Sequence, residues 1–328
     1  MTRPLAVSLG DPAGIGAEVI AKSWERRRSA YLPPFFVVGE IAAIAAVWNG
    51  PVATIASPDE AADRFADVLP VLRVGDGCAV MPGSPDGDGA RSALDALEMA
   101  VGLTRSGAAS ALVTGPVSKA RLYGIGFVHP GQTEFVAERC GVAAGMVAMM
   151  LAGPTLRTVP VTTHVPLRDV PAALSVDLIV AKGRTTIRGL RRQFGIARPR
   201  LAVAGLNPHA GEDGALGREE IDVIEAAVAR LRDEEADVTG PHPADTMFHE
   251  AARRRYDAAL CMYHDQALIP LKALHFDEGV NITLGLPIVR TSPDHGTAFD
   301  IAGKDVADPA AMIAAIRLAD ACARRMAA

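Results

Sequence analysis

The sequence predicts an α/β protein whose short parallel strands alternate with covering helices. Strand-like apolar runs alternate with helical segments along nearly all of the 328 residues. Runs such as LAVAGL are partly β-branched and only a few residues long, which is typical of buried parallel strands. Aromatic residues make up 5% and hydrophobic residues 49% of the chain, so small apolar side chains dominate. Such a chain is long enough for two α/β lobes.

The predicted elements follow one another in βα order. The strand-like runs are Leu5–Leu9, Phe35–Val38, Ala111–Thr114, Arg157–Thr162, Leu201–Gly205 and Ala258–Met262. The predicted helices are one that begins near Ala17, then Ser92–Arg105, Val176–Phe194, Glu219–Glu234 and Pro309–Met326. In the last helix, Met312, Ile313, Ile316 and Ala319 follow helical spacing. Residues 79–90 are rich in Gly, Pro and Asp, which indicates an exposed loop.

The first strand ends in the turn GDPAGIG, which does not match a dinucleotide-binding fingerprint. That fingerprint requires G-x-G-x-x-G and a downstream acid for the ribose. The turn instead has Asp11, Pro12, Gly14 and Gly16, and the next strand offers only Glu40 at its end. We therefore expect a tight strand-to-helix turn, with the helix N-terminus directed to the same edge of the sheet.

Composition argues against several classes of protein. The net charge of −5 has no offsetting basic stripe, which disfavours nucleic acid as a partner. Cys78, Cys140, Cys261 and Cys322 lack C-x-x-C spacing and indicate reduced thiols. The N-terminus lacks a charged-then-apolar leader, and no apolar stretch reaches membrane-spanning length. We expect a cytoplasmic protein with no membrane contact.

Three histidines each stand at the end of a short apolar run and are each expected to open a polar loop. They are His164 in TVPVTTHVPL, His209 in LAVAGLNPHAG and His264 in AALCMYHDQALIP. Ligands of open α/β sheets bind outside the carboxyl ends of the strands. Three imidazoles at that edge suit a divalent metal with an open coordination position. The alternative, that each is an ordinary loop or core histidine, stays open from the residues alone.

The densest polar region extends from Tyr263 to Gly303. Lys272 and Arg290 lie there in segments that contain Gly and Pro and are therefore predicted to be loops. Both are natural counter-charges for an anionic substrate. Two ordinary surface cations are the alternative interpretation. The stretch RTSPDHGTAFDIAG is rich in turn formers and backbone donors that suit the phosphates and ribose of a nucleotide.

Seven motifs along the whole chain together resemble one family. GDPAGIGAE, TGPVSKA, GQTEF, TTHVPL, NPHAGEDG, YHDQALIPLK and RTSPDHGTAFDIAG resemble the PdxA family, the 4-hydroxythreonine-4-phosphate dehydrogenases. The resemblance implies two α/β/α lobes similar to those of isocitrate and isopropylmalate dehydrogenases, not a Rossmann domain. We expect residues 1–125 with 285–328 in the first lobe and 126–284 in the second. The active site is expected in the cleft and at a homodimer interface.

The resemblance also implies roles for individual residues. His164, His209 and His264 match three ligands of one divalent ion per subunit (Zn, Mg or Co), with one histidine from the partner subunit. The implied substrate-binding residues are Gln132, Thr133, Lys272, Asn281 and Arg290, and the expected NAD- or NADP-binding residues are Asp294, His295 and Gly296. The family pattern has His where this chain has Gln132, which replaces an ionisable contact with a neutral one.

The implied reaction is hydride transfer from C3 of 4-phosphooxy-L-threonine to NAD(P)+. The product, a β-keto acid, then loses CO2 to give 3-amino-2-oxopropyl phosphate for pyridoxal 5'-phosphate synthesis. The expected base is Asp245, with Asp265 and Lys272 behind it, and a bound water is equally compatible. Two other enzyme classes remain open: a related dehydrogenase acting on another hydroxy acid or a carboxylated cis-dihydrodiol, and a phosphate acyltransferase. A non-catalytic metal-binding protein is the least favoured alternative.

Overall fold

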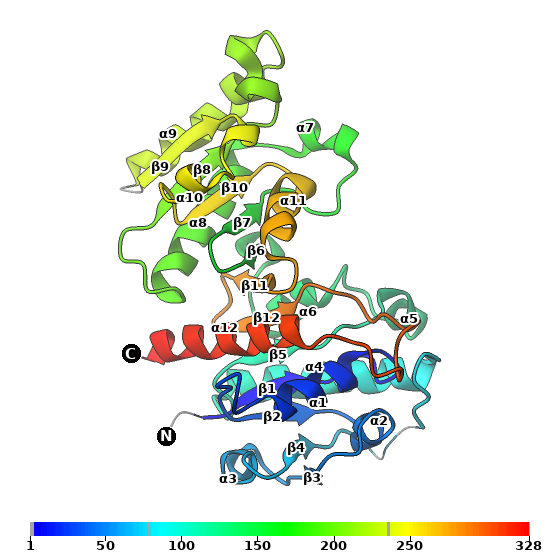
Figure 1. The fold of residues 1–328 in the computed structure, drawn as a ribbon. Coiled ribbons are helices and arrows are strands. Elements are labelled where there is room, and N and C mark those ends of the chain that lie inside the picture. Colours follow the sequence, from blue (N-terminus) through cyan, green and yellow to red (C-terminus); the bar gives the residue numbers. More distant parts are fainter. Residues whose placement is uncertain (1–2, 76, 78, 235–236, 328) are drawn as a thin grey trace. The chain divides into compact units, whose positions relative to one another are not determined.

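The computed structural model describes residues 3–75, 77, 79–234 and 237–327 (Figure 1). The chain divides into two compact units: unit 1, Met1–Gly141 with Pro287–Ala328, and unit 2, Val142–Leu286. The lobe boundaries expected from the sequence were at residues 125/126 and 284/285. Each unit has a sheet with helices, so the predicted α/β class is confirmed. Of the four cysteines, Cys78 lies outside the described residues.

The sheet of unit 1 is parallel throughout, with strand order β3-β4-β2-β1-β5-β12. Its central strands β1 and β2 are wholly buried, because helices cover both faces. The strands are β1 Leu5–Ser8, β2 Phe35–Val38, β3 Val52–Thr54, β4 Leu69–Leu72, β5 Leu112–Thr114 and β12 Arg290–Pro293.

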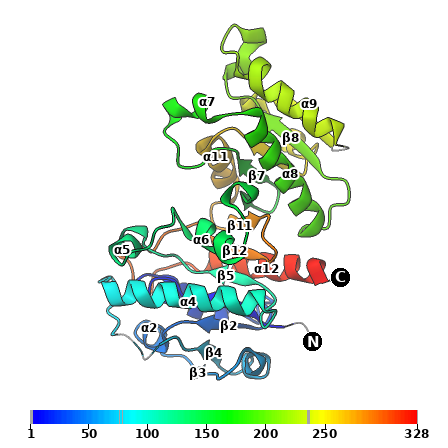
Figure 2. The same cartoon turned by 180° about the vertical axis from the view of Figure 1, so that it is seen from behind.

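In unit 1, α1 and α12 lie on one face of the sheet and α4 on the other (Figures 1 and 2). The helices are α1 Gly16–Glu25, α2 Ile41–Ala45, α3 Ala61–Arg64, α4 Gly87–Arg105, α5 Lys119–Gly124, α6 Gln132–Arg139 and α12 Ala310–Ala327, with a 3₁₀ turn at Pro58–Glu60. Helix α4 begins within the segment predicted as a loop. The Asp86 side chain accepts the Gly89 N–H at 2.7 Å and so caps the helix.

The sheet of unit 2 has strand order β11-β6-β7-β10-β8-β9. Strand β6 is antiparallel to both neighbours, whereas β7, β10, β8 and β9 are parallel. The strands are β6 Ala148–Ala152, β7 Arg157–Pro160, β8 Arg200–Ala204, β9 Asp237–His242, β10 Ala258–Cys261 and β11 Val280–Leu284.

In unit 2, α8 and α9 cover one face of the sheet and α11 the other (Figures 1 and 2). The helices are α7 Val170–Ala173, α8 Val176–Arg192, α9 Glu225–Asp233, α10 Glu250–Arg253 and α11 His264–His275, with a π-helical segment η5 at Glu220–Ile224. The 3₁₀ segments are η2 Ala144–Met146, η3 Leu167–Asp169, η4 Pro208–Gly214 and η6 Ala244–Thr246.

Two expectations about the polar region were wrong. Lys272 lies on helix α11, and Arg290 is the first residue of strand β12, so neither is in a loop. Pro270 lies inside α11, and such a residue makes a helix resemble a loop in the sequence. The helix forms nonetheless because Ala267 and Leu271 are fully buried and pack it onto the sheet. The predicted helix Glu219–Glu234 is also divided, into the π-helical segment η5 and α9.

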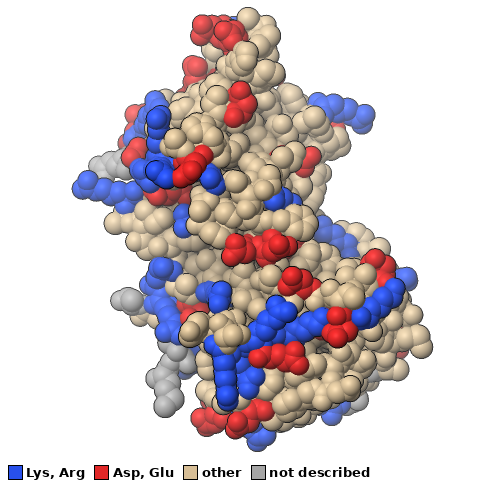
Figure 3. Space-filling model, viewed as in Figure 1, with Lys and Arg blue, Asp and Glu red and all other residues tan. Residues whose placement is uncertain are grey.

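No helix among the described residues is long and apolar enough to cross a membrane. On the face shown in Figure 3, basic and acidic side chains lie in adjoining patches, in keeping with the near balance of 33 basic and 38 acidic residues.

Candidate active site

The three histidines follow three neighbouring parallel strands of unit 2. His164 lies beyond β7, His264 directly beyond β10 and His209 beyond β8, and β10 pairs with both of the other strands. Asp245 lies beyond β9, the next strand in order. Since carboxyl ends of parallel strands share one edge, all four residues belong to the same edge of the sheet.

His164 and His264 form a pair at this edge. Their ring centroids are 5.8 Å apart, with the planes tilted by 38°. Both line a hollow of about 220 Å³, together with Tyr263 and Asp265. His264 Nδ1 donates to Asp265 Oδ1 at 2.7 Å, which leaves the lone pair of the neutral ring on Nε2. His264 is the first residue of α11 and does not open a loop.

His209 lies apart from this pair and is largely exposed. It lines a different hollow, of about 620 Å³, and its Nδ1 donates to Glu212 Oε2 at 2.9 Å. In the part of the chain that the structure describes, no three His, Cys, Asp or Glu side chains are grouped to hold a metal. A single chain therefore brings two of the three predicted ligands together but not the third.

The backbone at two of these histidines is in the left-handed region. His164 has a φ of 54° and His209 a φ of 52°. Residues other than glycine rarely adopt this conformation, although His does so more often than most, and it concentrates at functional sites. Both imidazoles are thus presented by turns that the surrounding structure must hold.

A buried glutamine connects the three strand ends. The Gln266 carbonyl accepts the Met262 N–H at 2.6 Å, and its amide donates to Gly205 O at 2.7 Å. The Thr162 hydroxyl donates to Met262 O at 2.8 Å. The chain segments beyond β7, β10 and β8 are therefore tied laterally just before each histidine.

In unit 1, two threonine hydroxyls accept hydrogen bonds from a buried arginine. Arg290 is 3% exposed. Its Nη2 donates to Thr114 Oγ1 at 2.8 Å and its Nη1 to Thr133 Oγ1 at 3.4 Å. Burial lowers the pKa of Arg290 to about 10, and the nearby Glu134 opposes that shift. The guanidinium therefore stays charged at neutral pH, and a bound anion would relieve its desolvation.

Gln132 reaches the same group of residues from the start of helix α6. Its Nε2 donates to Gly115 O at 3.2 Å. Its Oε1 is buried and has no hydrogen-bond partner among the described residues. Gln132, Thr133 and Arg290, three of the five predicted substrate-binding residues, thus lie together beside Thr114 and Gly115.

The loop that carries Asp294, His295 and Gly296 follows β12 and packs on the GDPAGIG turn. Ile15 N–H donates to Thr297 O at 2.9 Å, and a Cβ on Gly14 would lie 2.9 Å from that oxygen. His295 Nδ1 donates to Gly296 O at 3.1 Å, and its buried Nε2 has no hydrogen-bond partner among the described residues. A Cβ on Gly296 would meet nothing within 4 Å, so there is space beside this backbone.

The remaining predicted residues lie in unit 2. Lys272 is half-buried on α11, Asn281 is half-buried on β11, and Asp245 is exposed on η6. The Asn281 Oδ1 atom is buried without a hydrogen-bond partner among the described residues.

Sequence reasoning missed several buried polar residues, in each of the two units, that contact the segments described above. Asp11 is 2% exposed and accepts the Ala13 N–H at 3.1 Å, and burial raises its pKa. Thr114, Gln266 and the buried Glu220 were likewise assigned no role. For Asp11 the signal was its place in the first turn, directly after a buried strand. The roles of the other three depend on contacts between distant segments.

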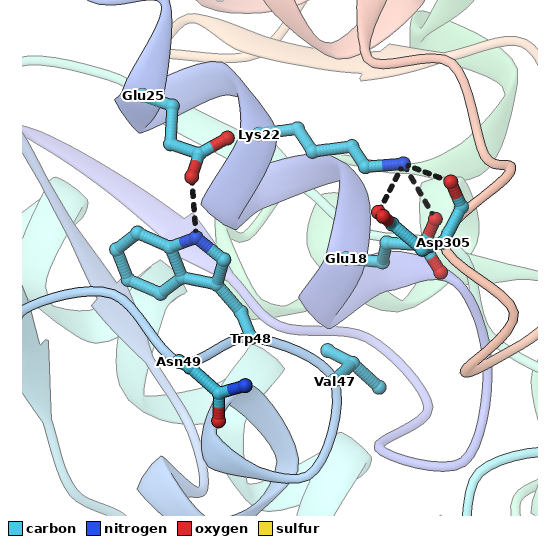
Figure 4. Close-up of a pocket in the computed structure, with 7 residues that line it drawn as sticks. All are labelled: Glu18, Lys22, Glu25, Val47, Trp48, Asn49 and Asp305. Atoms are coloured by element: carbon cyan, nitrogen blue, oxygen red, sulfur yellow. Dashed lines mark hydrogen bonds and ion pairs between the residues drawn. The ribbon is translucent and has the colours of Figure 1, made fainter.

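Lys22 lines a further hollow of unit 1, of about 220 Å³ (Figure 4). Its Nζ lies 2.8 Å from Glu18 Oε1 and 2.9 Å from Asp305 Oδ1, and it donates to Ala307 O at 3.0 Å. Trp48 Nε1 donates to Glu25 on the opposite wall at 2.7 Å. The Lys22 contacts connect α1 to the segment before α12, so these charged side chains are explained by the packing of unit 1 and need no ligand.

Comparison with known proteins identifies the family of this chain. The family model described as "Pyridoxal phosphate biosynthetic protein PdxA" matches residues 34–319. A relative named 4-hydroxythreonine-4-phosphate dehydrogenase, from Zymomonas mobilis, is 57% identical over 317 residues, which is 97% of this chain and 95% of the relative.

Two solved structures are also similar. The crystal structure of 4-hydroxythreonine-4-phosphate dehydrogenase from Klebsiella pneumoniae has a TM-score of 0.88 and 38% identity and covers 98% of both chains. A terephthalate 1,2-cis-dihydrodiol dehydrogenase from Burkholderia xenovorans has a TM-score of 0.67 and 29% identity, with 97% of this chain and 98% of that chain covered. The resemblance inferred from the motifs is thus confirmed. The chain belongs to the PdxA family.

Proposed function

We propose that this chain is an oxidoreductase that transfers a hydride from C3 of 4-phosphooxy-L-threonine to NAD(P)+. The observation that carries the proposal is the 57% identity, over nearly its whole length, to a relative named for this activity. The product, 2-amino-3-oxo-4-phosphooxybutanoate, is a β-keto acid and loses CO2 to give 3-amino-2-oxopropyl phosphate. This reaction belongs to pyridoxal 5'-phosphate biosynthesis, and we expect it to take place in the cytoplasm.

Arg290 and Thr133 are the proposed anchors for an anionic group of the substrate. Arg290 is buried and keeps its two Nη atoms on threonine hydroxyls, so its orientation is set before an anion arrives. Lys272 and Asn281 of unit 2 are proposed to contact the same substrate. Gln132 contributes a neutral acceptor, because its amide is already directed to Gly115 O.

His164, His264 and His209 are the proposed ligands of one divalent cation per subunit. Two imidazoles that share a tetrahedral ion at about 2 Å have ring centres roughly 5–6 Å apart, and the observed 5.8 Å between His164 and His264 fits this. The carboxylates on His264 Nδ1 and His209 Nδ1 fit as well, since metal-binding histidines commonly donate their other N–H in this way. When bound, the cation supplies Lewis-acid polarisation of the substrate's alcohol oxygen.

The partner subunit of a homodimer is the proposed source of the third histidine. His164 and His264 are already paired within one chain, whereas His209 lines another hollow. We infer that each site combines His164 and His264 of one chain with His209 of the other. The active site then lies at the dimer interface.

The loop Asp294–Gly296 is the proposed nicotinamide-cofactor site. His295 Nε2 is a buried acceptor that suits a hydroxyl or amide donor of the cofactor. The space beside Gly296 allows close approach to the backbone. Asp245 is the proposed base for the hydroxyl proton, with Lys272 as the second candidate. Asp265 is less suitable as the base, because its carboxylate already accepts a hydrogen bond from His264.

Reduction of NAD+ or NADP+ with 4-phosphooxy-L-threonine tests the proposal. We expect turnover that a chelator abolishes and that Zn²⁺, Mg²⁺ or Co²⁺ restores. A specific observation favours a second candidate: the likeness to a terephthalate cis-dihydrodiol dehydrogenase, together with Gln132 in place of the family's histidine. Turnover of a carboxylated cis-dihydrodiol, with none of the phosphorylated compound, would establish that candidate instead.

A further inference from the structure

The turn that carries His209 is left-handed over five consecutive residues. The φ angles are 52° at His209, 52° at Ala210, 85° at Gly211, 45° at Glu212 and 53° at Asp213. Left-handed turns of L-residues are disfavoured because Cβ approaches the following carbonyl oxygen. Such a turn persists only where neighbouring groups determine its conformation.

Glu220 is a buried side chain that contacts this turn and the segment that leads into it. It is 1% exposed, and it is the first residue of the π-helical segment η5. Its Oε1 accepts the N–H groups of Leu206 at 2.7 Å and Asn207 at 2.8 Å, and its Oε2 accepts Asn207 Nδ2 at 2.9 Å. One side chain thus satisfies two of the three backbone donors that lie between β8 and the turn, and the third, Gly205 N–H, donates to His242 O.

The turn also packs directly on this carboxyl group. A Cβ on Gly211 would lie 2.7 Å from Glu220 Oε2, and one on Gly205 would lie 3.0 Å from Glu220 Oε1. The chain therefore passes close to Glu220 both before and after His209. A π-helical bulge is rare and occurs frequently at functional sites, and here it begins at the residue that makes these contacts.

We propose that Glu220 is a positioning residue for His209, which sets the turn that presents this imidazole to the metal. The inference rests on the proposed function in one respect, that His209 is a metal ligand. Glu220 itself is directed to backbone and amide donors, so its effect on the metal passes through His209.

The neighbouring Glu219 provides a matched control. Its Oε2 accepts the same Asn207 Nδ2 at 2.7 Å, yet it contacts neither the Leu206 nor the Asn207 backbone N–H. Glu219→Gln and Glu220→Gln remove the same formal charge. Both Glu220 oxygens accept hydrogen bonds, so Glu220→Gln must place its NH2 group against a donor beneath the turn. At Glu219 the Asn207 amide meets Oε2, and the carbonyl of the new glutamine in Glu219→Gln can accept in its place. The pair therefore separates positioning from charge.

The experiment is a Co²⁺ titration of the full-length chain after removal of metal by a chelator. We expect Glu220→Gln to weaken Co²⁺ binding about 10–100-fold, as loss of a group that orients a ligand does. Gly211→Ala should have a similar effect, because it displaces the turn from the opposite side of the contact. Glu219→Gln should bind as the wild type does, and thermal unfolding would verify that each variant is folded.

A second readout needs no metal. Exchange of the Leu206 and Asn207 amide hydrogens in the metal-free protein should accelerate in Glu220→Gln and stay slow in Glu219→Gln. If Glu220→Gln does not fold, Gly211→Ala carries the same test. Wild-type Co²⁺ affinity in both Glu220→Gln and Gly211→Ala would overturn the proposal, as would an equal loss in Glu219→Gln.

The outcomes distinguish this inference from the proposed function. Weak Co²⁺ binding by Glu220→Gln, with no turnover of 4-phosphooxy-L-threonine by the wild type, would support the positioning role and reject the substrate. Normal turnover by the wild type, with unchanged Co²⁺ binding in the variants, would support the substrate and reject the positioning role.

Discussion

The two units differ in how far each has assembled its own candidate site residues. In unit 1 the proposed anion-binding group is already assembled, because Arg290 donates to both Thr114 and Thr133. In unit 2 two histidines form a pair, the third lies on a left-handed turn, and the described residues group no three metal-binding side chains. A single chain thus assembles the arginine–threonine group, whereas its described residues do not bring the three predicted metal ligands together.

Loss of a paired histidine should have the largest effect. We expect His164→Ala or His264→Ala to lower kcat/KM at least about a hundredfold, because metal-ion catalysis contributes several kcal/mol. Metal content should fall with activity, while thermal unfolding should change little because neither side chain is in the core. His129→Ala is the control and lies in unit 1. Stoichiometric metal and normal turnover in both variants would remove the metal site from unit 2.

Replacement of Arg290 tests whether the anion-binding group is complete within unit 1. Arg290→Lys keeps the charge but loses the planar pair of donors on Thr114 and Thr133. We expect KM for 4-phosphooxy-L-threonine to rise roughly 10–100-fold, since a charge-assisted hydrogen bond contributes about 1.5–3 kcal/mol. Metal content should not change. Arg317→Lys, whose arginine donates to Ala30 O in the same unit, is the matched control. An unchanged KM would mean that the anion is bound elsewhere.

Gln132→His gives a smaller effect on the same group. A neutral hydrogen bond contributes about 0.5–1.5 kcal/mol and a charge-assisted one about 1.5–3 kcal/mol. The variant should keep activity on the phosphorylated substrate, with a KM that falls most below about pH 6.5, where imidazole is protonated. Steady-state kinetics on hydroxythreonine with and without its phosphate measure this. A wild-type preference for the dephosphorylated compound, not altered by Gln132→His, would contradict the substrate assignment.

The smallest predicted effect is a pH dependence of the free energy of unfolding, which we expect from histidines of unit 2 and not from Arg290 of unit 1. His275, the last residue of α11, accepts the Thr155 N–H on Nε2 at 3.3 Å. Burial lowers its pKa, Glu278 opposes this and Arg253 adds to it. A lowered pKa means that the unfolded chain binds the proton more readily, so this contribution to stability is full above about pH 6.5 and declines as pH falls.

The measurement is the free energy of unfolding between pH 7 and 5. His275→Gln should flatten its pH dependence but not abolish it, because burial also lowers the pKa of His242 in the same unit. Arg290, with a pKa of about 10, does not titrate in this range. An identical pH dependence in wild type and variant would show that His275 does not couple to folding.

The sequence predicted the strand ends and their chemistry better than the contacts between them. The apolar runs before His164, His209 and His264 place them at one edge of the sheet, because strand length and composition are local properties. The pairing of His164 with His264 depends on β10 lying beside β7, which no local pattern encodes. Pro270 concealed α11, since burial of Leu271 outweighs the local signal. Glu220 was overlooked because its partners, Leu206 and Asn207, precede it by more than a dozen residues.

Mixing of inactive subunits tests most directly whether the metal site is shared between chains. A His209→Ala chain combined with a His264→Ala chain should regain about a quarter of wild-type activity at full exchange, since half of the dimers would then contain one intact site. A His164→Ala chain combined with a His264→Ala chain should regain none, because every site would lack one member of the pair. Recovery in the second mixture and none in the first would contradict the account.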